Sequence, residues 1–339
     1  MGTKKVSQKD FEKWVEKLIG LQKVFGVQSK DDKYEFGALL KAENLRLDYD
    51  ITILPPKKYF LPSTEQLFSF GESGFNSSVD GEPFILFGVH PYDFVAIRQL
   101  DVLFSMKNND VYYQTRRNAA TIIVCDVENI SENAFSGFLG FDHVEKGFDL
   151  LVTKTGSDYL VESGSDKGKK LLSLMENAVD AQAADISKRS EKWKKNRELL
   201  KKQLLKANVN ELPAALGKAY DHKIWNEKAE KCFSCGSCNL VCPTCYCFDV
   251  QDDFGWDLKS GERTRSWDGC MIENFATVAG DHNFRKNKSD RYRHRYYRKG
   301  KYVPEKIGEI ACVGCGRCIS ACVARIANPV EIFNAVAEA

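Results

Sequence analysis

The stretch from Lys231 to Val250, KCFSCGSCNLVCPTCYCFDV, decides how the rest of the sequence is interpreted. Its first four cysteines, Cys232, Cys235, Cys238 and Cys242, are separated by two, two and three residues, and a proline follows them. This spacing is typical of a [4Fe–4S] site, where a tight loop directs three thiolates at one cluster. In proteins with two such clusters, the fourth cysteine of the run ligates the other cluster. The run therefore predicts a second run.

The second run lies near the end of the chain, in CVGCGRCISAC. It contains Cys312, Cys315, Cys318 and Cys322 at the same spacing. Exchange of the fourth cysteines predicts one cluster held by Cys232, Cys235, Cys238 and Cys322, and another held by Cys312, Cys315, Cys318 and Cys242. A zinc ribbon typically needs only two C-x2-C pairs, and cysteines at two-residue spacing do not form an ordinary disulfide framework, so both alternatives fit less well.

Three further cysteines, Cys245, Cys247 and Cys270, lie in the long segment between the two runs. We expect them close to the first cluster. They could bind a third iron–sulfur cluster, with His282, Asp249 or Asp268 as the fourth ligand, or remain free thiols that shield the first cluster.

Length and composition indicate a protein of two or three domains, because 339 residues exceed what one core usually serves. The net charge of +2 gives no support for a nucleic-acid partner. Twelve cysteines without a secretory signal are typical of metal ligands in a reducing compartment, so we expect a cytoplasmic protein. No apolar run approaches about 18 residues, so no transmembrane helix is expected.

The first 165 residues show the pattern of an α/β domain. Apolar periodicity predicts helices over 10–21 and 93–104, and strands over 84–89, 121–127, 148–153 and 158–163, after a hairpin within 23–40. Ligands of such sheets bind beyond the carboxyl ends of the strands, where His90, Asp93 and Cys125 fall. A single cysteine there is more often packed than ligating.

Two basic segments follow. An apolar stripe predicts one long helix over 167–206, whose lysines and arginines we interpret as a solvated face. The segment 285–302, RKNKSDRYRHRYYRKGKY, alternates basic and aromatic residues, a pattern also found in proteins that bind single-stranded nucleic acid. We favour a position beside the negatively charged clusters, or docking to an acidic partner. Both segments are candidate contact surfaces.

The sequence thus predicts an α+β protein: an α/β docking domain (1–165), a helical linker (166–225) and a ferredoxin-like two-cluster domain (226–339) with a long insertion (243–311).

Several phrases resemble one family closely. CFSCGSCNLVCPTCYCFDVQD, RTRSWDGCM, AGDHNFRKNKSDRYRHRYYRK and CVGCGRCISAC are similar to the iron–sulfur subunit of anaerobic sulfite reductases and to the beta subunit of soluble NAD(P)-linked sulfhydrogenases. PPKKYFLP, FGVHPYDFVAIRQLD and GFDLLVTKTGSDYLVESGSDKG resemble the upstream domain of that family, so the likeness covers most of the chain. The family commonly has cysteine in place of Tyr92 and more cysteines beyond the 121–127 strand, which argues against redox chemistry in this N-terminal domain.

The resemblance implies an electron-transfer subunit of an oxidoreductase complex with two [4Fe–4S] clusters and no catalytic residue of its own. Its partners would be a subunit that binds flavin and NAD(P), together with a catalytic subunit of the sulfite reductase or nickel–iron hydrogenase type. No nucleophile elbow, H-E-x-x-H, phosphate loop or C-x-x-C-H motif contradicts this. The alternative is a self-contained iron–sulfur oxidoreductase with a substrate or flavin site in the N-terminal domain, and a third class is an iron–sulfur sensor that binds DNA through 285–302.

Overall fold

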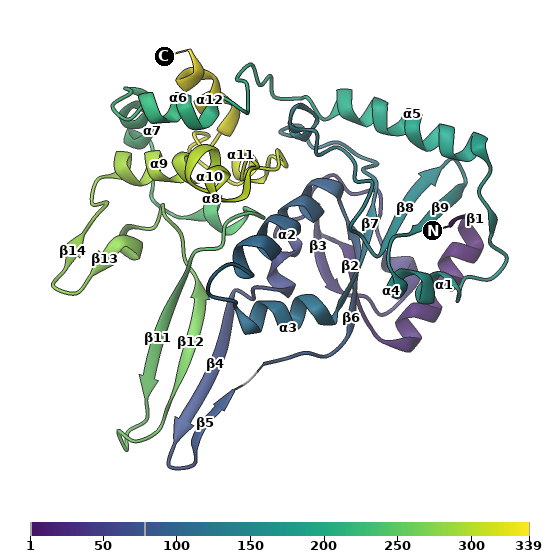
Figure 1. Ribbon diagram of the computed structural model, residues 1–339, viewed down its shortest axis with the longest axis horizontal. Coiled ribbons are helices and arrows are strands. Elements are labelled where there is room, and N and C mark those ends of the chain that lie inside the picture. Colours follow the sequence, from purple (N-terminus) through teal and green to yellow (C-terminus); the bar gives the residue numbers. More distant parts are fainter. Residues whose placement is uncertain (1, 78, 339) are drawn as a thin grey trace.

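The computed structural model describes residues 2–77 and 79–338, and an eight-stranded sheet forms the centre of its N-terminal half (Figure 1). The strands follow in space as β10–β1–β9–β8–β7–β6–β2–β3, and the four from β8 to β2 are parallel. Their bounds are β1 (Thr3–Ser7), β2 (Lys23–Lys30), β3 (Lys33–Ala38), β6 (Phe84–Val89), β7 (Ala120–Cys125), β8 (Leu150–Thr155), β9 (Asp158–Ser163) and β10 (Val179–Asp180). The predicted hairpin and strands are all present.

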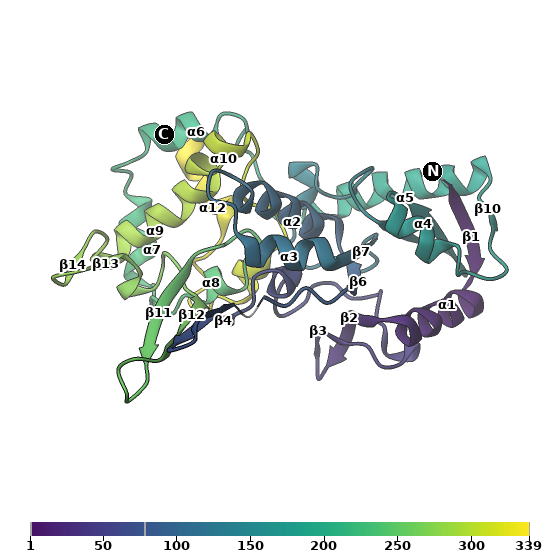
Figure 2. The ribbon, with the colours of Figure 1, turned by 60° about the horizontal axis from the view of Figure 1, so that its bottom comes forward.

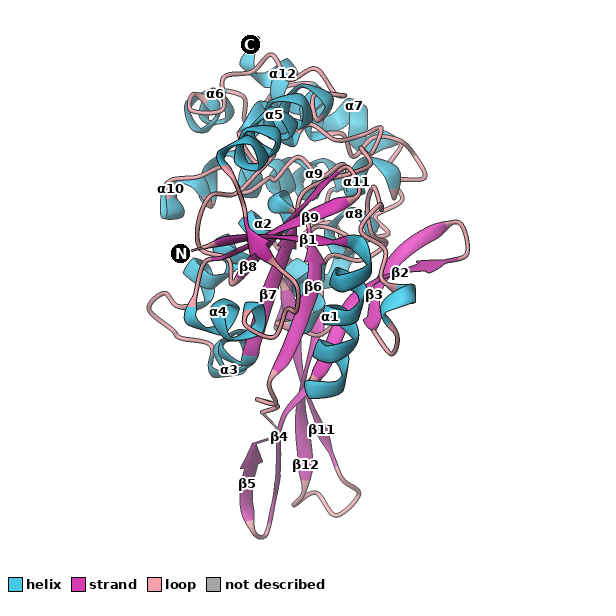
Figure 3. Cartoon of the chain, turned by 90° about the vertical axis from the view of Figure 1, so that its right-hand side faces the viewer, coloured by secondary structure: helices cyan, strands magenta, loops and turns pink. Residues whose placement is uncertain are grey.

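Helices cover both faces of this sheet (Figure 3). Helix α1 (Gln8–Leu21) packs on one face, where Trp14 meets Phe87 with ring centroids 5.9 Å apart. Helices α2 (Pro91–Phe104) and α3 (Val111–Ala119) lie on the other face, against residues such as Leu86. Because successive residues of a strand point to opposite faces, a continuous apolar strand such as β6 serves both layers.

The prediction of one helix over 167–206 is wrong. The segment forms α4 (Asp166–Leu172), then β10, then α5 (Ala183–Leu199). Helix α4 ends at Leu172, Asn177 takes a left-handed φ of 55° in the turn that follows, and β10 then pairs with β1 at the edge of the sheet. Helix α5 restarts with a capping box between Gln182 and Asp185. The apolar stripe gave no indication of the breaks on either side of β10.

A second sheet joins segments from both halves of the chain. It runs β11–β12–β4–β5, entirely antiparallel, and consists of β4 (Thr64–Gly71), β5 (Gly74–Ser77), β11 (Phe248–Phe254) and β12 (Gly261–Trp267). This sheet projects from the body of the molecule (Figures 1 and 3). Near its base, Arg265 of β12 donates to Glu65 of β4 at 2.6 and 2.9 Å, and both side chains are buried. The insertion between the cysteine runs is therefore anchored to the N-terminal half.

Short helices surround the two cysteine runs. They are α6 (Leu212–Lys218), α7 (Ile224–Glu230), α8 (Ser237–Leu240), α9 (Lys288–Tyr297), α10 (Pro304–Ile307), α11 (Arg317–Ser320) and α12 (Pro329–Ala337), with a small hairpin of β13 (Thr277–Val278) and β14 (His282–Asn283). Figure 2 shows these helices as one group beside α2. The mixed architecture confirms the predicted α+β class. Among the described residues, no helix is long and apolar enough to cross a membrane.

Candidate iron–sulfur sites

The two cysteine runs fold into the same loop. Ser234 and Gly314, which lie between the first and second cysteines, have φ of 55° and 68°. Gly236 and Gly316, between the second and third, have φ of 72° and 81°, and a short helix, α8 or α11, begins directly after each. Left-handed residues at these positions bend the chain sharply enough for successive cysteines to face one centre.

One cavity is lined by cysteines from both runs. Its walls include Cys312, Cys315 and Cys318 of the second run together with Cys242 of the first, all four of them buried. Gly314 and Gly316 let this loop lie directly against 133–136, because an added Cβ would come within 2.5 Å of Ser136 or 2.7 Å of Asn133. The cavity brings together the four residues that the sequence predicts for one cluster.

The other predicted set, Cys232, Cys235, Cys238 and Cys322, lies nearer the surface and is called the outer set here, while the four cysteines of the cavity form the inner set. Cys235 is exposed, and Cys232, Cys238 and Cys322 are half-buried. Burial raises the pKa of the Cys238 thiol to about 11; Arg295 opposes this rise, and nearby Cys270, Cys322 and Cys232 add to it. Cys238 thus interacts with Cys322 of the second run as well as with Cys232 of its own.

Two cysteines of the set nearer the surface accept backbone hydrogen bonds of the kind found around clusters. The N–H of Ser234 donates to the Cys232 sulfur and the N–H of Ile326 donates to the Cys322 sulfur, each at 3.4 Å. Such bonds stabilise cluster thiolates and influence the cluster potential. Within the described ranges, no three His, Cys, Asp or Glu side chains converge closely enough for a single metal ion. A single zinc ion needs ligands that converge on one point, whereas the thiolates of a cluster bind separate iron atoms and lie further apart. The cysteines present therefore fit a cluster better than a zinc ion.

The basic segment 285–302 turns one face toward these cysteines. Arg291, Arg295 and Lys299 follow one another at four-residue intervals along α9 and the π-helical turn Arg298–Tyr302, and all three are buried. Lys299 donates to the sulfurs of Cys242 at 3.0 Å and Cys245 at 3.5 Å. Burial disfavours the charged lysine, but these two sulfurs outweigh it and raise its pKa. The basic segment thus lies beside the cysteines that are expected to hold clusters, whereas these three buried side chains cannot form a contact surface.

Arg317 connects the second run to the central sheet. Its guanidinium makes a bidentate ion pair with Asp93 of α2, at 2.6 Å for both bonds, and also donates to the carbonyl oxygen of Thr52 at 2.9 Å. Arg317 and Asp93 are buried. Asp93 follows the carboxyl end of β6, where the sequence suggested a ligand site. In the structure, the second cysteine loop occupies this position through Arg317.

Sequence reasoning missed this pair, and it did not predict that Arg291, Arg295 and Lys299 would be buried. Nothing in the spacing connects Asp93 with Arg317, which are 224 residues apart. The four-residue interval of Arg291, Arg295 and Lys299 could have indicated a shared face, because residues at this interval lie on one side of a helix.

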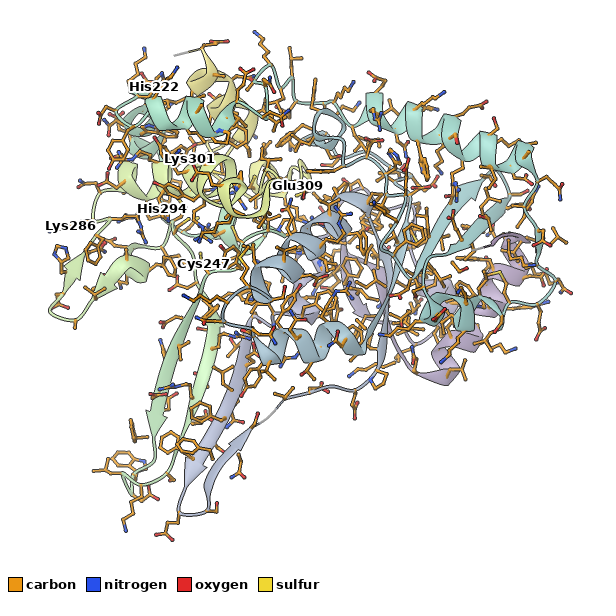
Figure 4. All side chains as sticks on the ribbon, viewed as in Figure 1. His222, Cys247, Lys286, His294, Lys301 and Glu309 are labelled. Carbon is orange, nitrogen blue, oxygen red and sulfur yellow. The ribbon has the colours of Figure 1, made fainter. Side chains whose placement is uncertain are left out.

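Cys245, Cys247 and Cys270 line a single small cavity, and Cys270 lies near Cys238 of the first run. The three suggested fourth ligands are not among its walls. His282 is exposed on the β13–β14 hairpin, which extends away from α8 and α11 (Figures 1 and 2). Cys247 lies where the projecting sheet meets the cysteine loops (Figure 4). Cys125, by contrast, is packed inside the central sheet.

Comparison with known proteins agrees with this geometry. Residues 231–326 match the family model of a 4Fe-4S dicluster domain. The chain is 35% identical over 338 residues to sulfhydrogenase 2 subunit beta of Pyrococcus furiosus, and the alignment covers 98% of each chain. The chain belongs to the sulfhydrogenase beta-subunit family. The resemblance seen in the sequence is confirmed for that branch.

Membership in the sulfhydrogenase beta-subunit family extends over the N-terminal sheet as well as the cysteine runs, because the alignment spans nearly the whole chain. No solved structure matches this chain. In this chain, the second cysteine loop is held on α2 by the ion pair of Arg317 with Asp93.

Proposed function

We propose that this chain is the electron-transfer subunit of a sulfhydrogenase-type complex. It would relay electrons between a subunit that binds flavin and NAD(P) and a catalytic subunit of the nickel–iron hydrogenase or sulfite reductase type. When bound, two [4Fe–4S] clusters would supply one-electron acceptor and donor centres. The relative is named as one subunit of a sulfhydrogenase, which supports a role within a larger assembly.

The observation that carries the proposal is the difference in depth between two adjacent cysteine sets. Cys235 is exposed, whereas Cys242, Cys312, Cys315 and Cys318 are buried. Helices α8 and α11, which begin within the two runs, pack against each other. A relay needs one centre that a partner can approach and another that is shielded from water, and the cysteines provide these two environments.

Apolar side chains mark the accessible end. Phe233 and Val323, which neighbour cysteines of the outer set, are 71% and 85% exposed. Exposed apolar residues beside a redox site favour close contact with a partner subunit, because the contact removes them from water.

The N-terminal domain, in this proposal, supports the cysteine loops and carries no redox centre. Asp93 forms an ion pair with Arg317, and Cys125 is buried within the sheet. These observations disfavour the alternative of a self-contained oxidoreductase with its own substrate site. None of the described cysteines forms a disulfide, which fits a reducing compartment, and we propose the cytoplasm.

Anaerobic purification from the native source tests the proposal. We expect the chain to co-purify with a flavoprotein and a catalytic subunit. The isolated, iron-loaded chain should accept electrons from an artificial donor but neither oxidise hydrogen nor reduce sulfite or a sulfur compound with NAD(P)H. Turnover of any of these by the isolated chain would instead establish the self-contained enzyme.

Lys299 provides a more local prediction. Replacing it by methionine, Lys299→Met, removes a positive charge whose Nζ lies 3.0 Å from the Cys242 sulfur. The reduction potential of the buried cluster should fall by roughly 100 mV, since a nearby cation favours the extra electron at an effective dielectric constant of about 20. Potentiometric titration followed by electron paramagnetic resonance (EPR) measures the shift, and Lys299→Arg, which retains the charge, should stay near the wild-type value. Equal potentials in all three proteins would contradict this account.

A further inference from the structure

The small cavity beside the two cysteine sets has the composition of a ligand site. It is lined by Cys245, Cys247 and Cys270, together with Asn239 and the cationic residues Arg295, Arg298 and Lys299. Its cavity volume is about 20 Å³, the same as that of the cavity lined by Cys242 and the second run. Two neighbouring cavities of similar size are therefore lined by thiols and cations.

Three separate elements deliver these cysteines to one place. Cys245 closes the turn after the first run, where its N–H donates to the carbonyl oxygen of Cys242 at 3.3 Å. Cys247 directly precedes β11, and Cys270 follows β12. The pairing of these strands begins with Phe248 opposite Trp267, and Asp268 continues it by donating to the carbonyl oxygen of Cys247 at 3.2 Å. The projecting sheet thereby fixes the ends that carry Cys247 and Cys270.

The side chain of Asn239 links two of the sulfurs. Its Nδ2 lies 3.4 Å from the sulfur of Cys270 and 3.6 Å from that of Cys245. Its Oδ1 accepts from the N–H of Met271 at 3.2 Å, which orients the amide so that its donors face the cavity. Asn239 is buried. An N–H donor held toward two sulfurs is the type of contact that stabilises metal-bound thiolates.

The lining of the cavity is positively charged. Arg295 and Lys299 are buried, Arg298 is half-buried, and no carboxylate belongs to the described lining. The Nε atom of Arg295 is buried without a hydrogen-bond partner, and its terminal nitrogen has the Cys245 sulfur at 3.8 Å. Buried cations are costly unless they are paired. Thiolates, rather than neutral thiols, would supply the missing charge.

We propose that Cys245, Cys247 and Cys270 bind a third iron–sulfur cluster. The inference rests on the proposed electron-transfer function and extends it from two centres to three. Because no imidazole or carboxylate lines the cavity, the protein would supply three thiolates to this cluster and no fourth side-chain ligand from the lining. They suit a three-iron cluster, or a four-iron cluster whose remaining iron has a ligand from outside the protein. Either species places a redox centre between the cysteine loops and the base of the projecting sheet.

Iron and acid-labile sulfide counts on the anaerobically reconstituted full-length chain test the proposal. Two four-iron clusters give about eight irons per chain, and we expect about eleven or twelve. The variants Cys270→Ser and Cys247→Ser should each return the count to about eight while the EPR signals of the two main clusters remain. Low-temperature EPR of the oxidised protein separates the two species, because an oxidised three-iron cluster is paramagnetic and an oxidised four-iron cluster is not.

The matched control is Cys125→Ala, which removes another buried cysteine, remote from the site, and should leave the iron count unchanged. A wild-type count of about eight would overturn the third cluster and leave the two-centre proposal intact. A wild-type count near zero after reconstitution would overturn both. If a serine variant does not fold, the wild-type count and its oxidised EPR spectrum still decide the question.

Discussion

Cys322→Ser should produce the same spectrum as Cys235→Ser, although the two residues belong to different runs. If the fourth cysteines are exchanged, both substitutions remove a ligand of the outer cluster. By the same reasoning, Cys242→Ser should match Cys315→Ser, because the cavity of the second run includes Cys242. Each variant should lose about four irons, and electron transfer through the complex should fall to background. EPR of the reduced proteins, with iron counts, provides the comparison.

The opposite pairing would refute the exchange. If Cys322→Ser matched Cys315→Ser, each cluster would be held by the four cysteines of one run. Cys125→Ala is the appropriate control here too, since it removes a cysteine from the central sheet rather than from a loop.

Asp93→Ala should strongly destabilise the protein. It leaves the guanidinium of Arg317 buried without its carboxylate, and breaking a buried ion pair in this way typically costs about 3–5 kcal/mol. Because Arg317 lies between Cys315 and Cys318, the loss should also loosen the inner cluster site. Anaerobic urea unfolding measures the change in free energy, and the rate of iron release to a chelator measures the second effect.

The double variant Asp93→Leu with Arg317→Met is the control for this pair. It removes both charges and retains apolar volume, so it should recover much of the lost stability. If Asp93→Ala unfolds at the wild-type urea concentration, the pair does not hold the cysteine loop on the sheet.

Local patterns in the sequence predicted local structure well. The strand 158–163 coincides with β9, and the continuous apolar run at 84–89 coincides with β6, because a strand buried on both faces has no polar positions. The cysteine runs could be recognised for a similar reason, because the cysteines of each run lie within a few residues of one another. The family assignment followed from phrases that contain these runs.

Features that depend on distant contacts could not be predicted in this way. The pairing of β4 with β12 and the ion pair of Asp93 with Arg317 join residues that no periodicity connects. The long helix was predicted wrongly because its apolar stripe continues through Asn177, whereas the competing partner, β1, lies far away in sequence. The cavity of Cys245, Cys247 and Cys270 required the β11–β12 hairpin to bring its two sides together.

The projecting sheet also has a consequence for synthesis of the chain on the ribosome. Glu65 and Arg265 are 200 residues apart, so at roughly 5–20 residues per second β4 waits about 10–40 seconds for β12. Until then, β4 and β5 form a lone hairpin that carries Phe68, Phe70 and Phe75, and such hairpins are only marginally stable. The nascent chain therefore exposes aromatic residues throughout translation of its middle third. Under the exchanged ligation, the outer cluster also needs Cys322, so loading of this cluster would follow synthesis of the second cysteine run.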